Sequence, residues 1–247
     1  MIGAIIQARL GSSRLPGKII KKINKRQLIE IMISRLRKSK LINKIIICTT
    51  YNKEDEKILE ICQKMNIDCI RGSTSNVLSR YLKAAKKFKI KTIVRLTSDC
   101  PLIDPKIIDK MLLQYNLSNF DFLSNTCPPN KSTFPDGTDV EIFDFKTFAK
   151  IAKIEKRKEF LEHVTYNYWK DNKYKSSVFL NNKNYSKYRY TLDYKEDLIV
   201  LKKIINYFGN KIDIVSTNQI VNYLKKNRDI YLINDKCKNL SSNWKKL

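Results

Sequence analysis

Short apolar runs alternate with amphipathic segments through the first half of the chain, and this alternation restricts the possible folds more than any other feature. Runs typical of buried strands cover residues 2–7, 44–49, 68–70 and 92–97. Apolar residues recur at helical spacing between them, over residues 28–36, 54–65 and 77–88. Continuous apolar strands separated by amphipathic helices predict a mostly parallel sheet with helices on both faces. Because ligands of such sheets bind at the carboxyl ends of the strands, we expect the functional residues there.

The second half of the chain is less regular. Further helices are predicted from their capping residues, at Asp104–Pro105, over 194–208 and at Ser216–Gln219. The alternation is lost around residues 120–184. We expect a single α/β domain over residues 1–247, with a small inserted lobe or dimer arm around 120–184.

The composition favours a soluble globular protein. Of the 247 residues, 43% are hydrophobic and 30% are charged, which excludes a disordered chain. No apolar stretch approaches the length of a membrane span, and the amino terminus has no cleavable signal pattern. We therefore expect a cytoplasmic protein with no membrane partner.

The formal net charge of +25 raises the alternative of a basic RNA-binding protein. Such a protein would bind RNA without regard to sequence and mainly at low salt. The lysines are spread over nearly every predicted helix and are not gathered in one arm or tail. Scattered lysines of this kind are typical of solvated helix faces. We expect no nucleic-acid partner.

Cysteine and histidine are distributed in a way that excludes several chemistries. The six cysteines lie at no metal-binding or redox spacing, and His163 is the only histidine. A zinc site or a histidine-based catalytic triad is therefore not expected.

The segment that follows the first predicted strand, residues 7–18 (QARLGSSRLPGK), resembles a phosphate-binding loop in composition. Gly11 and Gly17 permit positive φ angles and a close approach of the backbone to a ligand. Arg9, Arg14 and Lys18 supply charged donors that match phosphate oxygens. The loop therefore predicts a polyphosphate ligand.

The spacing of this loop is not that of a P-loop. A P-loop would have glycine at Ser12 and a hydroxyl residue at Ile19, directly after the lysine. No hydroxyl is thus placed for a metal ion. A basic surface turn remains the alternative, so other segments must identify the ligand.

Two aspartates follow predicted strands elsewhere. Asp99 comes just after 92–97, and Asp193 comes just after 188–192, which we interpret as another strand. If both segments belong to the same sheet, both carboxylates lie at the edge that carries the basic loop. Mg²⁺ is commonly held by one or two carboxylates together with substrate phosphates and water. The sequence therefore predicts a Mg²⁺ site, although an aspartate that follows a strand is, taken alone, more often a helix cap or turn residue.

Six motifs in this order resemble those of a known family. They are QARLGSSRLPGK, GSTSNVLSRY, RLTSDCPLID, FPDGTDVEIF, EHVTYNY and TLDYKEDL. From residue 1 to about 207 the chain resembles the cytidylyltransferases of bacterial surface polysaccharide synthesis. The resemblance points to the spore coat polysaccharide biosynthesis branch, which is related to the CMP-Kdo and CMP-acylneuraminate synthetases.

The resemblance implies a fold, a reaction and partners. The fold is a three-layer Rossmann-like nucleotidyltransferase fold with a mostly parallel central sheet. The reaction transfers CMP from CTP to an acidic sugar of the 2-keto-3-deoxy type, releases pyrophosphate and uses Mg²⁺. The resemblance also implies a homodimer.

The resemblance further assigns roles to individual residues. Lys18 and Arg9 match the catalytic positions. The nucleotide-binding positions are Ala8, Arg9, Gly11, Ser12, Ser13, Arg14, Lys18, Arg71, Ser73, Asn76 and Thr97. The metal ligands are Asp99 and Asp193. The positions that face the acceptor are Asp136, Thr138, Asp139, Glu141 and His163. Ser98 departs from the family pattern, which has glycine there.

Alternatives remain within the enzymes. A sugar 1-phosphate nucleotidylyltransferase would use another nucleotide, although its loop usually differs from the RLPGK order found here. A nucleotide-sugar-dependent glycosyltransferase shares the layout, but an Asp-x-Asp after a strand is missing. For His163, which we place on a helix beside Phe160 and Val164, a packing role is the alternative to substrate contact or acid–base work.

Overall fold

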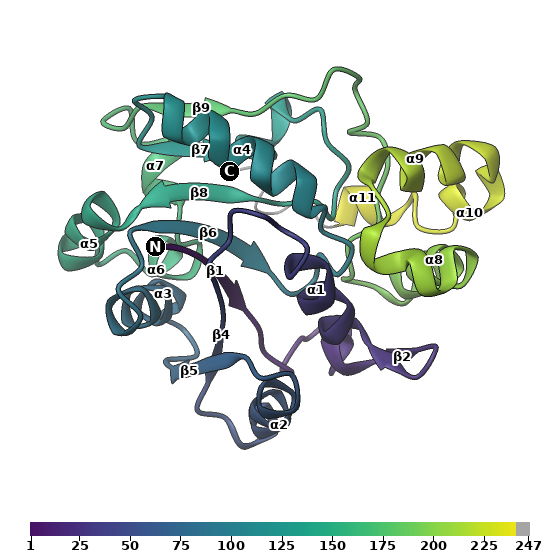
Figure 1. Cartoon of the computed structure of the whole chain (residues 1–247), viewed down its shortest axis with the longest axis horizontal. Helices are drawn as coiled ribbons and strands as arrows, with labels where there is room; N and C mark the ends of the chain where they lie inside the picture. The colour runs from purple at the N-terminus through teal and green to yellow at the C-terminus, as the bar shows by residue number, and fades with distance from the viewer. Residues whose placement is uncertain (241–247) are drawn as a thin grey trace.

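The computed structural model describes residues 1–240 and has a seven-stranded sheet at its centre, in the order β5-β4-β1-β6-β8-β7-β9 (Figure 1). The strands are β1 (Ile2–Gln7), β4 (Lys44–Thr50), β5 (Asp68–Gly72), β6 (Thr92–Thr97), β7 (Phe122–Ser124), β8 (Glu141–Asp144) and β9 (Ser176–Val178). The pairs β1–β4, β1–β6, β4–β5 and β7–β9 are parallel, and β8 is antiparallel to both of its neighbours. The predicted mostly parallel sheet is confirmed.

The helices predicted over 28–36, 54–65 and 77–88, at Asp104–Pro105, over 194–208 and at Ser216–Gln219 are present and begin close to those positions. The helices of the structure are α1 (Leu28–Leu36), α2 (Glu56–Lys64), α3 (Val77–Lys87), α4 (Pro105–Leu117), α5 (Phe145–Ile154), α6 (Lys158–Glu162), α7 (Tyr166–Lys170), α8 (Lys195–Phe208), α9 (Thr217–Lys226), α10 (Arg228–Leu232) and α11 (Cys237–Leu240). Short 3-10 turns and a small hairpin complete the chain: η1 (Lys18–Ile20), β2 (Lys22–Ile23), β3 (Arg26–Gln27), η2 (Lys53–Asp55), η3 (Pro129–Lys131) and η4 (Gly209–Ile214). None of the helices within residues 1–240 is long and apolar enough to cross a membrane.

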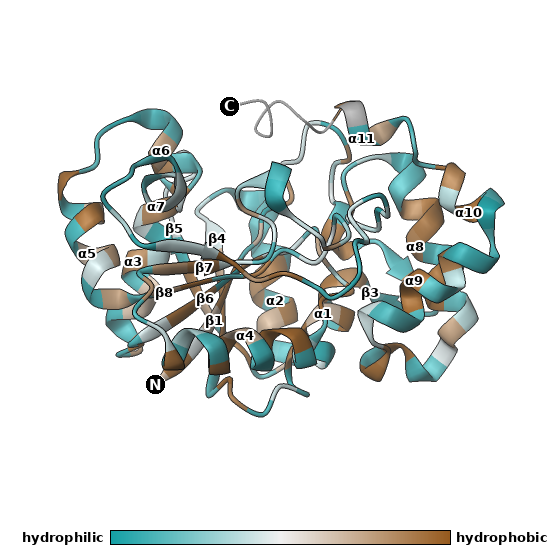
Figure 2. Cartoon of the chain, turned by 90° about the horizontal axis from the view of Figure 1, so that it is seen from above, coloured by the Kyte–Doolittle hydropathy of each residue, from teal (hydrophilic) through white to brown (hydrophobic). Residues whose placement is uncertain are grey.

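The central strands are buried on both faces, as their continuous apolar runs require. In β1, Ala4 and Ile6 belong to the core shared with α1, α2 and α4. Ile5, between them, belongs to the core shared with α3, α5 and α7. Figure 2 shows the apolar strands enclosed between helices that carry hydrophilic residues on the outside. This alternation within one strand produces the three layers.

The helices after β9 form a third core beside α1 (Figure 1). Apolar side chains of α8, α9 and α10 pack against one another and against Leu28 and Ile31 of α1. The buried Arg35 guanidinium of α1 adds a polar contact to this core, because it donates hydrogen bonds to the backbone carbonyls of Ile103, Ile212 and Val215. The segment between α8 and α9 is thus fixed to α1, and through it to the loop between β6 and α4, by a buried polar contact as well as by apolar packing.

The stretch 120–184, for which an inserted lobe or dimer arm was expected, contributes three strands to the central sheet. Its strands β7, β8 and β9 extend the sheet beyond β6. Because β8 is antiparallel to β6, its first residue, Glu141, pairs with Arg95 near the carboxyl end of β6. The stretch therefore reaches the edge of the sheet where ligands are expected, and a role in dimerisation stays a prediction.

Candidate active site

The basic loop leaves β1 at the predicted edge of the sheet and is held there by neighbouring backbone and acidic groups. The Leu10 amide donates to Asp55 Oδ1 at 2.7 Å, and the Gly17 amide donates to the Leu10 carbonyl at 3.0 Å. Gly17 has φ of 63°, as predicted, and directs the chain into η1. The expectation of a positive φ at Gly11 is wrong, because the glycines with positive φ are Gly17, Gly137 and Gly209. A Cβ added at Gly11 would lie 2.6 Å from Oε1 of Glu54, an exposed side chain that can move aside.

The loop borders a cavity of about 430 Å³ at the carboxyl ends of β1 and β6. Its lining includes seven of the predicted nucleotide-binding residues: Ala8, Arg9, Ser12, Ser13, Arg14, Lys18 and Thr97. Ser98, the residue that departs from the family pattern, also lines it. We refer to this space as the nucleotide cavity.

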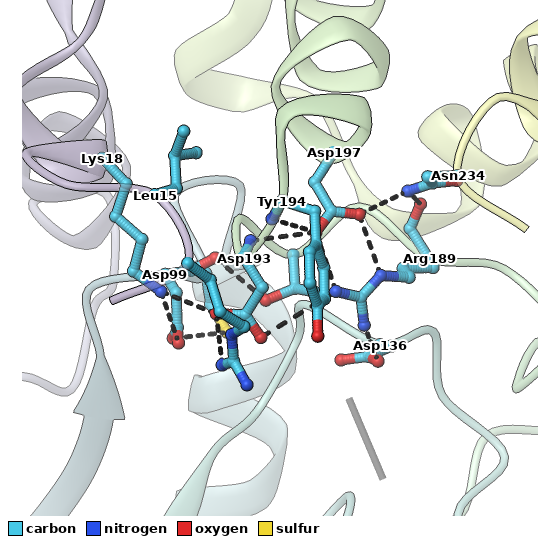
Figure 3. A network of polar contacts seen from close by, with 12 residues as sticks. Leu15, Lys18, Asp99, Asp136, Arg189, Asp193, Tyr194, Asp197 and Asn234 are labelled. Atoms are coloured by element: carbon cyan, nitrogen blue, oxygen red, sulfur yellow. Dashed lines mark hydrogen bonds and ion pairs between the residues drawn. The ribbon is translucent and has the colours of Figure 1, made fainter. Parts of the chain in front are cut away.

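Lys18 joins the two predicted metal ligands (Figure 3). Its ammonium group donates to Asp193 Oδ1 at 2.8 Å and to Asp99 Oδ2 at 3.3 Å, and Arg14 Nη2 lies 3.1 Å from the same Asp193 oxygen. Burial lowers the pKa of Lys18, but the two carboxylates raise it more, so its pKa lies above the usual value. Burial likewise raises the pKa of Asp99, and Lys18 lowers it below the usual value. The site is therefore a charged cluster in which one cation lies between two carboxylates.

The route that brings Asp193 to Asp99 differs from the one expected. The interpretation of residues 188–192 as a strand is wrong, since this segment makes only an isolated bridge between Asp136 and Arg189. Two hydrogen bonds to the Asp99 carbonyl replace the strand pairing, from the Leu192 amide at 2.9 Å and from the Thr191 hydroxyl at 3.1 Å. The carboxylates meet because one loop is tied to the backbone of the other.

A second cavity of about 270 Å³ shares Asp99 and Asp193 with the first. Four of the predicted acceptor residues line it: Asp136, Asp139, Glu141 and His163. We refer to this space as the acceptor cavity. Thr138 does not line it: the side chain is buried, and its hydroxyl donates to the Pro135 carbonyl at 2.8 Å. The lining also includes Tyr166 and Trp169, which the motifs did not single out as site residues.

Two arginines that sequence reasoning missed are built into the walls of the acceptor cavity. Arg95 Nη1 donates to Glu141 Oε2 at 2.6 Å, and Arg189 Nη1 donates to Asp136 Oδ2 at 2.6 Å. Burial lowers the pKa of Arg95, but Glu141 raises it more, so the guanidinium stays charged. Arg95 begins the RLTSDCPLID motif and Arg189 stands two residues before TLDYKEDL, yet only the fold brings each of them to its carboxylate.

His163 lies at the junction of the two cavities. The prediction that it stands within one helix is wrong, since it ends α6 and a turn separates it from α7. Its ring stacks on Tyr166 with centroids 4.4 Å apart. Burial lowers its pKa below the ordinary value, which favours the neutral imidazole. Its position agrees with substrate contact, and its role stays a prediction.

Four predicted nucleotide-binding residues lie outside the lining of the nucleotide cavity: Gly11, Arg71, Ser73 and Asn76. Arg71 donates to the carbonyls of Thr50 and Asn52. Ser73 accepts from the Asn76 amide, and Asn76 caps α3. In this structure these side chains organise the turn before α3.

Val77 and Arg80 of α3 do reach the nucleotide cavity, and Arg80 was not predicted from the sequence. It is buried in α3, and its Nη1 donates to the Ser73 carbonyl at 2.8 Å. Its Nε, also buried, has no hydrogen-bond partner within residues 1–240. The available signal was its helical register, because an arginine stands on the apolar face formed by Val77, Tyr81 and Ala84.

The donor set suits a hard divalent cation that keeps other ligands. Within residues 1–240, no group of three or more histidine, cysteine, aspartate or glutamate side chains is arranged to hold a metal ion. Asp99 and Asp193 already direct oxygens at a common cation, the Lys18 ammonium. Two carboxylates completed by phosphate and water oxygens are a usual arrangement for Mg²⁺.

Fold and site together define the class of protein. A seven-stranded α/β sheet with this loop after β1 is the architecture of the nucleotidyltransferases, as the sequence predicted. More narrowly, the chain belongs to the cytidylyltransferase family, whose profile matches residues 3–237. The match includes helices after Phe208, beyond the reach of the motif resemblance.

Known proteins support the family and the branch. A solved structure of a cytidylyltransferase from Leptospira borgpetersenii serovar Hardjo-bovis is 38% identical, with a TM-score of 0.87, and the match covers 93% of this chain and 96% of that one. The spore coat polysaccharide biosynthesis protein SpsF of Bacillus subtilis is 31% identical over 220 residues, which are 85% of this chain and 88% of SpsF. The predicted family and branch are confirmed, and with them a CTP-dependent nucleotidyltransferase.

The chain matches smaller parts of other relatives. It is 39% identical to the uncharacterized protein MJ1063 of Methanocaldococcus jannaschii over 161 residues, 65% of this chain and 64% of that protein. It is 29% identical to 3-deoxy-manno-octulosonate cytidylyltransferase 2 of Hydrogenovibrio crunogenus over 121 residues, 47% of each chain. These shares are below two thirds of each relative's length.

Proposed function

We propose that this protein transfers the cytidylyl group of CTP to a hydroxyl of an acidic, 2-keto-3-deoxy type sugar and releases pyrophosphate, for surface polysaccharide synthesis. The observation that carries the proposal is the convergence of the basic loop with Asp99 and Asp193, where Lys18 lies between the carboxylates. Membership of the cytidylyltransferase family supports CTP as the donor. The adjoining acceptor cavity supplies a place for the sugar.

Asp99 and Asp193 would hold the Mg²⁺ ion. When bound there, Mg²⁺ neutralises negative charge on the triphosphate and orients it. The Lys18 ammonium would then be free to leave the carboxylates and meet the phosphates, together with Arg9 and Arg14, which line the same cavity. Catalysis rests on positioning and charge neutralisation, because the sugar hydroxyl attacks the α-phosphorus in line with the departing pyrophosphate. His163 would accept the proton of that hydroxyl, and its lowered pKa and its position at the junction of the cavities support this role.

The ion pairs in the acceptor cavity favour a second candidate acceptor, a sugar without a carboxylate. Arg95 and Arg189 already neutralise Glu141 and Asp136, so a carboxylate would compete with these acids for them. Hydroxyl groups would instead donate hydrogen bonds to the carboxylates. The charge of the acceptor therefore distinguishes the two candidates.

The test is a pyrophosphate-release assay that crosses the four nucleoside triphosphates with a panel of acceptors, with and without Mg²⁺. The panel pairs each 2-keto-3-deoxy acid with its C1 amide, which keeps the ring and hydroxyls but lacks the charge, and adds sugar 1-phosphates. We expect Mg²⁺-dependent turnover with CTP and an acid. Turnover that is equal or faster with the amides would establish the second candidate. Turnover with UTP and a sugar 1-phosphate would overturn cytidylyl transfer.

We further propose that the enzyme works as a cytoplasmic homodimer. The family resemblance supports the dimer, and the composition supports the location. Light scattering after size exclusion should give twice the 29.1 kDa chain mass. Elution at the mass of one chain at micromolar concentration would contradict the dimer.

A further inference from the structure

Arg189, Asp197 and Asn234 form a buried polar cluster behind Asp193 (Figure 3). Its members are held by hydrogen bonds to one another, without a substrate. We propose that Asn234, in the turn after α10, is a positioning residue that holds the metal-ligand turn at Asp193. The carboxyl-terminal helices thereby act on the active site as well as on stability. The inference rests on the proposed metal site at Asp99 and Asp193.

Asp197 is the centre of the cluster. It is fully buried in the first turn of α8, and its Oδ2 accepts the backbone amides of Asp193 at 2.9 Å and Tyr194 at 3.0 Å. These bonds fix the main chain from which the Asp193 side chain projects. The direction of the Asp193 carboxylate is thus set by a second carboxylate that lies outside the cavity lining.

Arg189 compensates the charge of Asp197. Its Nε lies 2.9 Å from Asp197 Oδ1 and its Nη2 lies 2.7 Å from Oδ2, a two-point contact between groups that are both buried. The same guanidinium contacts Asp136 at 2.6 Å and lies 3.9 Å from Asp193 Oδ2. The Arg189 guanidinium therefore connects three carboxylates: Asp136 in the acceptor cavity, Asp197 behind the turn, and Asp193, the proposed metal ligand.

Asn234 completes the cluster from a distant part of the chain. It is 1% exposed, and its Nδ2 donates to Asp197 Oδ1 at 2.8 Å and to the Arg189 carbonyl at 3.3 Å. A buried carboxylate that loses such a donor is left with an unsatisfied hydrogen-bond acceptor, which costs free energy. Asn234 is the contact through which the segment after α10 reaches the turn that carries Asp193.

The same carboxyl-terminal region also contacts the segment that follows Asp99. The Thr217 amide, at the start of α9, donates to Asp104 Oδ2 at 2.8 Å, and Asp104 caps α4. The chain runs directly from Asp99 to this cap. The helices after Phe208 therefore support both metal-ligand loops, one through Asp104 and the other through Asn234.

The inference is tested by direct Mn²⁺ binding, measured by electron paramagnetic resonance with CTP present and acceptor absent. The variants are Asn234→Ala and the smaller hydroxyl donor Asn234→Ser, with Asn227→Ala as the matched control. Asn227 is an amide of the same helical region whose Nδ2 bonds the Tyr223 carbonyl instead. We expect Asn234→Ala to weaken Mn²⁺ binding by about 10-fold or more, because residues behind metal ligands have effects of this size. Asn234→Ser should weaken it less, and Asn227→Ala should leave it unchanged.

Kinetics provides an independent measurement. In Asn234→Ala the Mg²⁺ concentration for half-maximal rate should rise while kcat at saturating Mg²⁺ is largely restored. Wild-type Mn²⁺ affinity in folded Asn234→Ala, or in folded Asn234→Ser if the alanine variant does not fold, would overturn the positioning role. Equal weakening in Asn227→Ala would also overturn it, because the effect would then be general destabilisation. Absence of Mn²⁺ binding by the wild type would overturn the metal site itself and this inference with it.

Discussion

The loop after β1 and the wall of the acceptor cavity meet at Asp99 and Asp193 but hold their arginines differently. Arg9 and Arg14 stand on a loop, and the Arg14 side chain is 47% exposed. Arg189 in the acceptor wall is 1% exposed and bound to carboxylates. Exposed cations can pair with a polyanionic ligand that binds and leaves. Buried cations that are already paired with carboxylates instead hold the residues of the cavity wall in place. On the proposed function, the contrast predicts that charge selects the donor and that shape and hydroxyl contacts select the acceptor.

The largest effect is expected where the cavities meet. Asp99→Asn and Asp193→Asn should each lower Mg²⁺-dependent kcat by about 10³-fold or more, because an amide supplies no charge for the cation. Stopped-flow or endpoint pyrophosphate assays give the rate, and circular dichroism checks the fold. Full activity in either variant would place the metal site elsewhere.

The next effect tests the nucleotide side alone. Lys18→Met should lower kcat by about 10³-fold, because the variant loses the cation that meets the phosphates. It should also strengthen Mn²⁺ binding in the absence of nucleotide, since the ammonium no longer occupies the space between the two carboxylates. Lys22→Met, which changes an exposed lysine nearby, serves as the control. If Lys18→Met binds the metal ion more weakly while Lys22→Met is unchanged, the ammonium group does not compete with the metal ion for the two carboxylates.

His163→Asn tests the junction. We expect a loss of about 10²-fold in kcat, within the usual range for a general base. Burial places the pKa of His163 below 6.5, so the neutral base persists as pH falls to that value and is lost only at lower pH. The wild-type rate should therefore decline below pH 6.5, and this acid limb should disappear in the variant. An unchanged pH profile would assign His163 to packing against Tyr166.

The smallest effect is expected on the acceptor side. Asp139→Asn should raise the KM for the acceptor by about 10-fold, because a sugar hydroxyl loses a hydrogen bond to a charged group. The KM for CTP should not change, since Asp139 lines only the acceptor cavity of the two. Initial-rate measurements with each substrate varied decide the point. A matched rise in both constants would mean that the cavities are not separate in function.

The sheet was predictable from sequence because its central strands are buried on both faces. Strand β6 has the predicted bounds, and the caps of α4 and α9 stand where their residues indicated. The meeting of Asp99 with Asp193 was also expected, but for the wrong reason, because strand pairing was assumed where a loop is bonded to the Asp99 carbonyl. Such irregular backbone contacts have no periodic signal.

The rest of the site depends on contacts between distant segments. Arg80 is hidden within an apolar helix face, and Arg95 pairs with Glu141 across 46 residues of sequence. Asn234 reaches Asp197 from a turn that carries no motif. Pairings of this kind follow from the three-dimensional arrangement, so sequence periodicity does not predict them.

The reversed direction of β8 has a consequence for engineering. The nucleotide loop leaves the sheet at the end of a strand, whereas the segment that carries Asp136 and Asp139 enters the sheet at the start of β8. On the proposed function, the loop after β1 and the segment before β8 therefore carry separate parts of donor and acceptor recognition on one edge. A graft of residues 126–140 from a relative with another sugar should transfer acceptor choice while the CTP loop stays intact.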